Sequence, residues 1–402
     1  MHYFRKIKNI INEKGGIFFV TYIFKRLVLM VGNHFFWSSN KRAIINATKN
    51  KQVIIINKTI EWNYAFQRTQ QLATQFSKKP DFCVIYVTEP TVYYDYFINI
   101  DKINDHLFCF SYKHYLLLDE LLSTSKSRIL YITNLLNYEN DIKISYDKMV
   151  YEYIDELSLW FKDDMNKGLE LHKKAIRDAD LIVATATKLY EETQKITDKV
   201  ILCENAGDYD FFSKIDTYKS NELISKISAK YDCILGYYGM LAEWFDFDLI
   251  KEIARKHNNW AWVLIGPTYP NYDLSQNKLE NYDNIYILGA KPYTDLPTYI
   301  KKINILTIPF KLNDITASTS PVKLFEYMAA NKPIITSNMK ECRRYKSVNI
   351  YQTTDQFEVI VEKIMNMTSD ESKKYVKILE KDAKDNTWEK RADMIIDYLN
   401  LY

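Results

Sequence analysis

The sequence predicts an α/β protein with two parallel sheets whose strands alternate with helices. Two observations predict this class: a length of 402 residues, which exceeds one typical domain, and two successive series of short apolar runs separated by helical patterns. Many of these runs are β-branched and apolar throughout, as strands covered by helices on both faces should be. The first series of expected strands is Lys51–Asn57, Phe82–Thr88, Leu107–Ser111, Arg128–Thr133, Met149–Ile154, Leu181–Ala186 and Val200–Glu204.

A second series begins near Cys233, after the polar stretch Ser213–Lys230, which we interpret as a linker. A final amphipathic helix is expected to start at Thr387, a suitable N-cap residue. The expected strands of this series are Cys233–Tyr238, Ala261–Ile265, Ile285–Leu288, Ile303–Pro309, Pro333–Thr336 and Asn349–Gln352. Helical patterns in the two series include Phe66–Ser77, Trp160–Ala179, Phe247–His257, Thr294–Lys302 and Pro321–Ala330.

Residues 1–50 form a basic segment that also contains many aromatic and aliphatic residues. They hold nine Lys or Arg and one acid, Glu13, a net charge of +8, whereas the whole chain carries +3. Lys25 and Arg26 interrupt the apolar run, so no uncharged stretch approaches the ~20 residues of a spanning helix. The segment has no early apolar run followed by a small-residue cleavage site, so we do not expect a secretory signal. We expect residues 1–45 to form an amphipathic helix on an anionic membrane surface; a helix packed on the protein is the alternative.

The cysteines and the charge distribution exclude several other classes. The cysteines are odd in number and scattered, with neither metal-ligand spacing nor a disulfide framework, so we expect no bound metal and a reducing cytoplasm. The basic residues from Lys8 to Arg26 are the one nucleic-acid candidate, and no nucleic-acid-binding motif accompanies them. The five cysteines are Cys83, Cys109, Cys203, Cys233 and Cys342.

The segment from Ser320 to Ser337 is the most specific signal in the chain. Ser320 is the expected N-cap of a helix, and Pro321 fits the first helical position. Lys323 and Glu326 lie three residues apart and therefore share one helical face. A helix N-terminus beside a lysine can bind a diphosphate, and a carboxylate one turn further can accept hydrogen bonds from a ribose diol. A solvated Lys323–Glu326 ion pair on an ordinary amphipathic helix is the alternative.

This segment resembles the donor-binding helix of GT-B nucleotide-sugar glycosyltransferases, of the polysaccharide-assembling, glycosyltransferase family 4-like type. The resemblance implies two Rossmann-like domains facing a cleft, a basic helical N-terminal extension and a C-terminal helix that crosses back. The implied parts are the extension (1–50), an acceptor domain (51–212), the linker (213–230), a nucleotide-sugar donor domain (231–385) and the crossover helix (386–402).

The same resemblance assigns expected roles in the donor domain. Lys323 would face the diphosphate and Glu326 the ribose. Ser320 would add to the diphosphate site at the helix N-terminus. Gly239, after an expected strand, would let the backbone approach a phosphate closely. The string around Gly289 and Tyr293 resembles the loop that holds the nucleotide base.

In the first domain, the segment Glu61–Ala73 resembles the post-strand loop and helix of polysaccharide-assembling transferases. Trp62 and Arg68 are therefore expected to contact the acceptor or a phosphate, for which a guanidinium is well suited. The structural alternative is that Arg68 pairs with Glu61 or caps local carbonyl groups.

Carboxylates follow the fifth expected strand, at the edge where the cleft should lie. Inverting transfer needs a general base to deprotonate the acceptor hydroxyl. Asp155 is the candidate base, with Glu156 and Glu152 behind it, and ordinary strand-end polarity is the alternative. Three histidines without supporting motifs remain as further candidates: His106, His114 and His172.

One position departs from the resembled family. Many retaining members carry two glutamates separated by seven residues, and the first touches the donor sugar. Counting back from Glu326, that first position is Ser318, and the nearest upstream acid is Asp314. Retention and inversion therefore both remain open, as does the identity of the donor sugar.

The sequence thus predicts a glycosyltransferase that uses a nucleotide-diphosphate sugar as co-substrate and needs no other cofactor. The expected acceptor is lipid-linked or a cell-surface polysaccharide, and the expected location is cytoplasmic, peripheral on the inner face of the cell membrane. Two alternatives stay open: a GT-B-like nucleotide-sugar epimerase, which would act without an acceptor, and a non-catalytic nucleotide-sugar-binding partner of a polysaccharide assembly complex.

Overall fold

The computed structural model divides the chain into two compact units, which are described separately. The first comprises residues 1–64 and 76–148, and the second residues 65–75 and 149–402, so the division falls within helix α3 (Arg68–Ser77). Within these units the structure describes residues 40–63, 66–88, 100–138 and 143–401. The expected basic extension therefore lies mostly outside the described residues; of its 50 residues only 40–50 are described, and 40–48 are helical.

The first unit holds a largely parallel sheet with strand order β3-β4-β2-β1-β5. Strands β1, β2, β4 and β5 pair in parallel, and the edge strand β3 pairs antiparallel with β4. Ile44, from the helical residues 40–48, is fully buried in the core of this unit. Besides residues 40–48, the unit contains β1 (Gln52–Thr59), β2 (Phe82–Thr88), β3 (Ile100–Asn104), β4 (Leu107–Ser111), α4 (Leu118–Leu121) and β5 (Ser127–Ile132).

The second unit begins with three parallel strands in the order β6-β7-β8. Helix α6 starts after its N-cap Asp164, whose side chain accepts a hydrogen bond from the Lys167 amide. The C-terminal helix α16 packs against β7. These elements are β6 (Lys148–Tyr153), α6 (Met165–Asp178), β7 (Leu181–Ala184), α7 (Thr187–Gln194), β8 (Val200–Leu202) and α16 (Trp388–Leu401).

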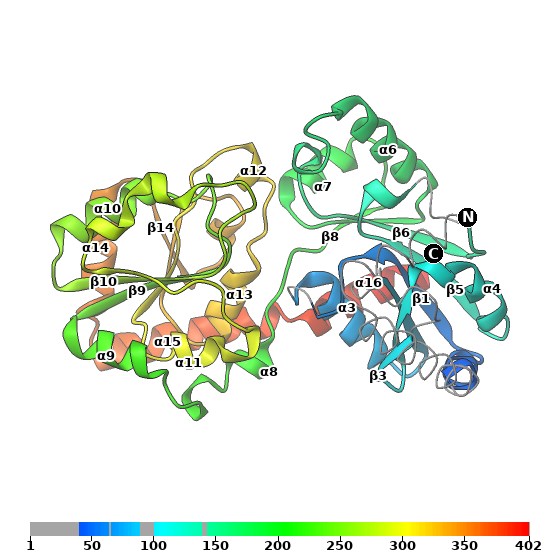
Figure 1. Cartoon of the computed structure of the whole chain (residues 1–402), viewed down its shortest axis with the longest axis horizontal. Helices are drawn as coiled ribbons and strands as arrows, with labels where there is room; N and C mark the ends of the chain where they lie inside the picture. The colour runs from blue at the N-terminus through cyan, green and yellow to red at the C-terminus, as the bar shows by residue number, and fades with distance from the viewer. Residues whose placement is uncertain (1–39, 64–65, 89–99, 139–142, 402) are drawn as a thin grey trace, which may run out of the picture. The chain divides into compact units, whose positions relative to one another are not determined.

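The rest of the second unit is a six-stranded parallel sheet with order β11-β10-β9-β12-β13-β14. Every residue of β9 and β10 is buried, as expected for strands covered on both faces. Figure 1 shows α10 and α14 above this sheet, and α9, α11 and α15 below it. The strands are β9 (Cys233–Tyr238), β10 (Trp260–Ile265), β11 (Ile285–Ile287), β12 (Ile305–Ile308), β13 (Ile334–Ser337) and β14 (Val348–Tyr351). The helices are α8 (Tyr209–Phe212), α9 (Glu222–Lys230), α10 (Phe247–Lys256), α11 (Leu296–Ile300), α12 (Asp314–Ala317), α13 (Val322–Ala329), α14 (Thr354–Met365) and α15 (Ser369–Asp385).

The strand order of this sheet positions a ligand site. From β9 the chain proceeds outward to β10 and β11, then returns to β12 on the other side of β9. The connections after β9 and β12 therefore leave in opposite directions, and open α/β sheets bind ligands at such a switch point, beyond the carboxyl ends of the strands. Gly239 follows β9, and the segment that leads to α13 follows β12.

The predicted fold class is confirmed, since parallel sheets alternate with helices as expected. One strand and three helices are among the elements that had not been expected. The sequence patterns did not predict strand β3, because only Ile100 is buried in it. Its charged residues suit an exposed edge. The stretch interpreted as a linker contains helix α9, which buries Ile224 and Ile227. Helices α14 and α15 occupy a region to which the sequence patterns had assigned no element.

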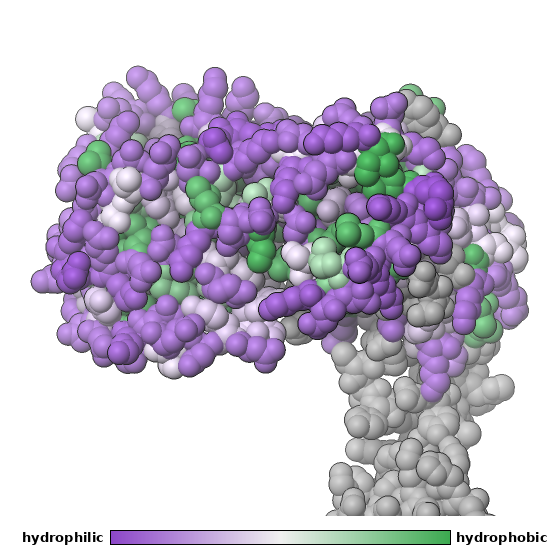
Figure 2. Space-filling view, turned by 90° about the horizontal axis from the view of Figure 1, so that it is seen from above, coloured by the Kyte–Doolittle hydropathy of each residue, from purple (hydrophilic) through white to green (hydrophobic). Residues whose placement is uncertain are grey.

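The surface is mostly polar on the face seen in Figure 2, where apolar residues form small separate groups among hydrophilic ones. All five cysteines are buried and carry free thiols. Within the part of the chain that the structure describes, none of the helices has both the length and the apolar character needed to span a bilayer.

Candidate functional site

Three glycines end three adjacent strands of the six-stranded sheet. Gly239 follows β9, Gly266 follows β10 and Gly289 lies just beyond β11, with φ values of 137°, 146° and 64°. These angles suit glycine, which lacks a Cβ. A Cβ at Gly266 would lie 1.9 Å from the Gly239 carbonyl oxygen, so no other residue fits there. The sheet edge is thus lined by backbone rather than by side chains.

Lys323, on the first turn of α13, lies beside this glycine edge. A Cβ at Gly239 would lie 2.7 Å from Lys323 Cε, so the glycine makes room for the lysine. The Lys323 ammonium lies 5.3 Å from the ring centroids of both Tyr237 and Phe310. Burial lowers the pKa of Lys323 to about 8. A poorly hydrated cation at the switch point favours an incoming anion.

The N-terminus of α13 differs in detail from the expectation. Pro321, not Ser320, occupies the N-cap position, and no side chain caps the first turn. The Ser320 hydroxyl instead accepts a hydrogen bond from the Asn205 amide over 3.2 Å, and the Ser320 carbonyl accepts one from Asn205 Nδ2 over 2.6 Å. Ser320 therefore bonds to Asn205 and does not cap the first turn of α13. Without a side-chain cap, the first turn remains available to an anion.

Glu326 is held by two tyrosine hydroxyl groups. Tyr238 donates to Oε2 over 2.6 Å, and Tyr293 donates to Oε1 over 2.7 Å. The glutamate is 3% exposed, so the alternative of a solvated Lys323–Glu326 pair is wrong. Burial raises the pKa of Glu326, while hydrogen bonds from the two tyrosines oppose the rise. Each carboxylate oxygen retains a lone pair that could accept from a ribose hydroxyl.

The loop that carries Tyr293 contributes an aromatic surface. The Tyr293 ring stacks on Phe211 with centroids 5.4 Å apart and planes inclined by 17°. Phe66 lies 6.4 Å from Tyr293 in a tilted arrangement. The space beside Gly289 is open, since a Cβ there would meet no atom within 4 Å. Aromatic rings next to open space suit the stacking of a planar base.

The turn from Asn205 to Asp208, to which the sequence assigned no role, packs on α13. A Cβ at Gly207 would lie 2.8 Å from the Phe325 carbonyl carbon, so only glycine allows this approach. Asp208 caps α8 by accepting from the Phe211 amide over 3.1 Å, and its charge helps to raise the pKa of Glu326, after the larger effect of burial. The turn thus packs against α13 and caps α8, the helix that carries Phe211.

Arg68 lies in a buried network and does not face an open site. Its Nε donates to Glu152 over 2.8 Å, and its Nη1 donates to the Glu204 carbonyl and to Asn205 Oδ1 over 3.0 and 3.2 Å. The residue is 4% exposed. Arg68 therefore has the carboxylate of Glu152 as a partner in place of an acceptor or phosphate, in line with the structural alternative of an ion pair. The reason is that a buried guanidinium takes carboxylate and carbonyl partners from its own fold.

Trp62, the other predicted acceptor residue, belongs to the first unit. Its ring meets Tyr86 edge to face, with centroids 5.1 Å apart. The Tyr86 hydroxyl donates to the Ile60 carbonyl over 2.9 Å, which fixes this loop on β2. Trp62 thus packs on the strand beside it.

The carboxylates after β6 take different positions. Asp155 is half-buried, and burial raises its pKa to about 6, which suits a base near neutral pH. Glu156 Oε2 accepts from Ser318 Oγ over 2.7 Å and from Lys188 Nζ over 2.9 Å. Glu152 is buried and pairs with Arg68. The structure thus brings Glu156, rather than Asp155, to the segment that precedes α13.

Of the three candidate histidines, His172 belongs to the second unit, and the other two belong to the first. His172 is buried and shares a hydrogen bond of 2.9 Å with the Tyr151 hydroxyl, and burial lowers its pKa to about 4. His106 lies 2.8 Å from the Lys51 ammonium in the first unit, where His114 also lies. Their surroundings favour packing and structural hydrogen bonds.

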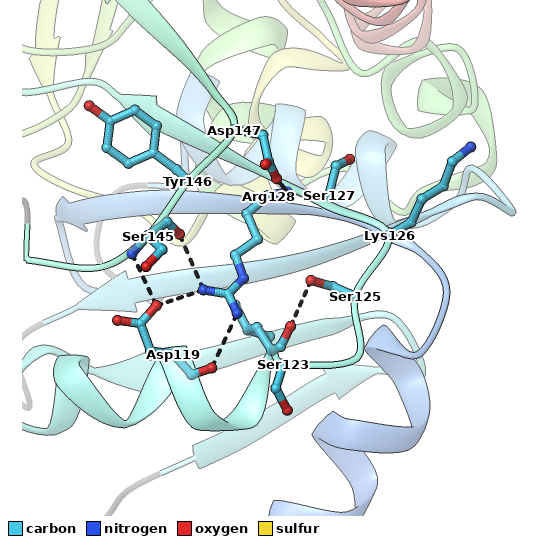
Figure 3. Close-up of a pocket in the computed structure, with 10 residues that line it drawn as sticks. Asp119, Ser123, Ser125, Lys126, Ser127, Arg128, Ser145, Tyr146 and Asp147 are labelled. Atoms are coloured by element: carbon cyan, nitrogen blue, oxygen red, sulfur yellow. Dashed lines mark hydrogen bonds and ion pairs between the residues drawn. The ribbon is translucent and has the colours of Figure 1, made fainter.

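A surface pocket of about 510 Å³ lies in the first unit at the amino end of β5. Figure 3 shows Arg128 pointing toward Asp119 and Ser145, while Lys126 points away from them. Arg128 Nη1 donates to Asp119 over 2.6 Å, so its charge is neutralised. Because parallel α/β sheets bind ligands at the carboxyl ends of their strands, this pocket is at the wrong edge for the expected chemistry. Among the described residues, no group of three or more His, Cys, Asp or Glu side chains could hold a metal ion.

Several residues of the site could not be found from sequence patterns. Tyr238 carries a weak signal, because it precedes Gly239 and a buried tyrosine hydroxyl needs a partner. Lys188 and Phe211 lie in ordinary helical patterns, and nothing local distinguishes them.

Comparisons with known proteins identify a related domain family, a related sequence and similar folds. Residues 222–386 match the family model described as Glycosyl transferases group 1. A Bacillus subtilis (strain 168) protein named as a teichuronic acid biosynthesis glycosyltransferase, TuaH, is 26% identical over 247 residues. That match covers 57% of this chain and 62% of the relative, so the chain spans about three fifths of its curated relative.

Solved structures share the fold. Anabaena Alr3699/HepE in complex with UDP and glucose has a TM-score of 0.63 at 12% identity, covering 88% of this chain and 100% of that chain. An Escherichia coli structure titled as trehalose-6-phosphate bound with UDP-2-fluoro glucose also gives a TM-score of 0.63, at 11% identity, covering 86% of this chain and 98% of that chain.

Proposed function

We propose that this chain, which has the GT-B fold and carries a Glycosyl transferases group 1 domain over residues 222–386, is a glycosyltransferase that uses a nucleotide-diphosphate sugar. The observation that carries the proposal is the packing of Gly239 against Lys323 at the start of α13, at the switch point of the six-stranded sheet. Backbone without side chains, a helix N-terminus and a poorly hydrated lysine together suit a diphosphate.

In the proposed reaction, negative charge develops on the leaving diphosphate as the sugar–phosphate bond breaks. The N–H groups of the first turn of α13 and the Lys323 ammonium are fixed in place before the reaction, so they stabilise this charge without reorganising. Glu326, oriented by Tyr238 and Tyr293, would accept hydrogen bonds from the ribose hydroxyl groups. The aromatic surface at Tyr293 and Phe211 would support the base.

Asp155 is the proposed base for an inverting transfer. A carboxylate with a pKa of about 6 is ionised at neutral pH and is a stronger base than an ordinary aspartate. In a retaining transfer Asp155 would instead contribute to acceptor binding.

The proposed acceptor is a lipid-linked or cell-surface polysaccharide intermediate. The name of the Bacillus subtilis relative refers to teichuronic acid biosynthesis. The basic and aromatic composition of residues 1–45 favours contact with an anionic membrane surface, and hence a peripheral location on its cytoplasmic side. Liposome co-sedimentation of the full chain and of a chain lacking residues 1–45 tests this part, and equal binding would count against it.

Nucleotide binding and turnover test the enzymatic proposal. A ligand that binds only the folded state raises the unfolding temperature, so UDP, GDP, dTDP and CMP are compared in a thermal-shift assay. UDP is the first choice, since the structurally similar Anabaena HepE forms complexes with UDP and UDP-glucose. The matching nucleotide sugar is then incubated with lipid-linked acceptors, and nucleotide release is measured. If none of the four nucleotides raises the unfolding temperature, the proposal is refuted. Nucleotide binding without turnover would favour a non-catalytic partner.

A further inference from the structure

We propose that Glu156 binds hydroxyl groups of the donor sugar and that its charge selects neutral sugars over uronic acids. This inference rests on the proposed function, because it concerns the sugar attached to the nucleotide diphosphate. Glu156, which follows β6, would supply a carboxylate at the end of the site where the donor sugar lies.

Glu156 is held in a defined orientation by two donors from different elements. It directly precedes the short helix η3 (Leu157–Leu159). Oε2 accepts from Ser318 Oγ over 2.7 Å and from Lys188 Nζ, on α7, over 2.9 Å. A carboxylate fixed through one oxygen presents the other in a constant direction, as a recognition site requires.

The second oxygen of Glu156 is available to a ligand. Within the described part of the chain, Oε1 has no hydrogen-bond partner, and the side chain is 20% exposed. An ionised carboxylate oxygen accepts about two hydrogen bonds. Sugar hydroxyl groups donate such bonds, and a charged acceptor makes them stronger than neutral ones.

The position of Ser318 relates Glu156 to the sugar end of the donor. Ser318 is the C-cap of α12 and lies two residues before Ser320, in the segment that leads into α13. With the diphosphate at the start of α13 and the ribose near Glu326, further along the helix, the sugar must extend in the opposite direction. That direction is toward the α12–α13 connection. The Ser318 side chain is short and 1% exposed, so the carboxylate beside it comes from Glu156.

The charge around Glu156 disfavours an acidic sugar. Lys188 is the cation that contacts Glu156, and it also interacts with the carboxylates of Glu192 and Asp314. The positive charge of Lys188 is therefore shared among three carboxylates. A uronic acid would add another carboxylate to this group, whereas a neutral hexose would only donate hydrogen bonds.

Isothermal titration of the full chain tests the inference. The probes are UDP, UDP-glucose and UDP-glucuronate, with GDP, GDP-mannose and GDP-mannuronate as the second series. In the wild type, the neutral nucleotide sugar should bind more tightly than the acidic one. Glu156→Gln keeps the shape but removes the charge, so affinity for the neutral sugar nucleotide should fall about tenfold. In this variant the acidic nucleotide sugar should no longer bind more weakly than the neutral one. The bare nucleotide should bind as in the wild type.

Glu191→Gln is the matched control, because Glu191 lies on the same helix as Lys188 and forms an exposed pair with Lys340 over 2.8 Å. It should leave all affinities unchanged. Equal loss of bare nucleotide and nucleotide sugar in Glu156→Gln, or no change in either, would overturn the inference while leaving the proposed function intact. A wild-type chain that binds none of UDP, GDP, dTDP and CMP would overturn both.

Discussion

The Tyr293 hydroxyl donates a hydrogen bond to Glu326 Oε1 over 2.7 Å, although 33 residues separate the two positions. Tyr293 lies in the loop after β11 and Glu326 lies on α13, so this bond joins the loop proposed to hold the base to the helix proposed to hold the ribose. The ring of Tyr293 also stacks on Phe211. One side chain therefore links the base surface with the ribose carboxylate.

Removing only the Tyr293 hydroxyl should weaken nucleotide binding. Tyr293→Phe keeps the ring and its stacking but leaves Glu326 with one donor, so the carboxylate is less well oriented. We expect a loss of about 1 kcal/mol, or roughly fivefold in affinity, measured by isothermal titration with UDP. Tyr272→Phe is the control, since Tyr272 contacts Asn277 and Phe247, outside the proposed site. Unchanged UDP affinity in Tyr293→Phe would show that the Tyr293 hydroxyl does not contribute to ribose binding through Glu326.

Replacing Lys323 should remove a charge-assisted contact with the diphosphate. Lys323→Ala is expected to cost about 1.5–3 kcal/mol of binding free energy, or roughly 10- to 150-fold. Glu326→Ala should weaken UDP binding through the ribose instead, so UMP affinity should fall as well. UMP, with one phosphate fewer, should respond less to Lys323→Ala. Wild-type affinities in both folded variants would exclude α13 from the site.

The lowered pKa of Lys323 predicts a pH dependence of nucleotide affinity. The free chain holds this lysine with a pKa of about 8, so the cation is present at pH 7 and lost as the pH rises through about 8. A bound diphosphate favours the charged form, so binding above pH 8 takes up a proton and affinity falls. Titrations with UDP from pH 7.5 to 9.5 should show this decline. Lys323→Arg stays charged and should bind evenly across the range; a parallel decline in that variant would contradict the assignment.

Asp155→Asn tests the proposed base. Nucleotide affinity should be retained, while turnover should fall about 100- to 10,000-fold if transfer is inverting. In the wild type, turnover should decrease as the pH falls through about 6, because Asp155 becomes protonated. Near-normal turnover in the folded variant would eliminate Asp155 as the base. The anomeric configuration of the product, read by NMR, distinguishes inversion from retention.

Arg68 should affect stability rather than ligand binding. Arg68→Met leaves the buried carboxylate of Glu152 without its ion-pair partner, so the free energy of unfolding should fall by about 3–5 kcal/mol in urea denaturation. Lys340→Met removes an exposed partner of Glu191 and should cost less than about 1 kcal/mol. A large loss of UDP affinity in a stable Arg68→Met protein would restore a direct role for Arg68.

Local sequence patterns predicted much of the fold and part of the site. The apolar runs at β2, β4 and β9 gave strand bounds that agree with the structure, because strands buried on both faces leave a continuous apolar signal. Asn331, just after α13, adopts a left-handed conformation with φ of 52°, which asparagine tolerates at the end of a helix. The bounds of α13 shifted, since Pro321 forms the N-cap and Ser320 is held by Asn205.

The sequence by itself determined the order of strands and helices, the glycine at Gly239 and the spacing of Lys323 and Glu326, because these depend on residues that are neighbours in the chain. Only the tertiary structure decided the partners. Arg68 pairs with Glu152 across 84 positions, Tyr238 with Glu326 across 88, and Ser318 with Glu156 across 162. Local patterns cannot distinguish one strand-end carboxylate from another. Their partners depend on which strand ends the sheet topology places side by side.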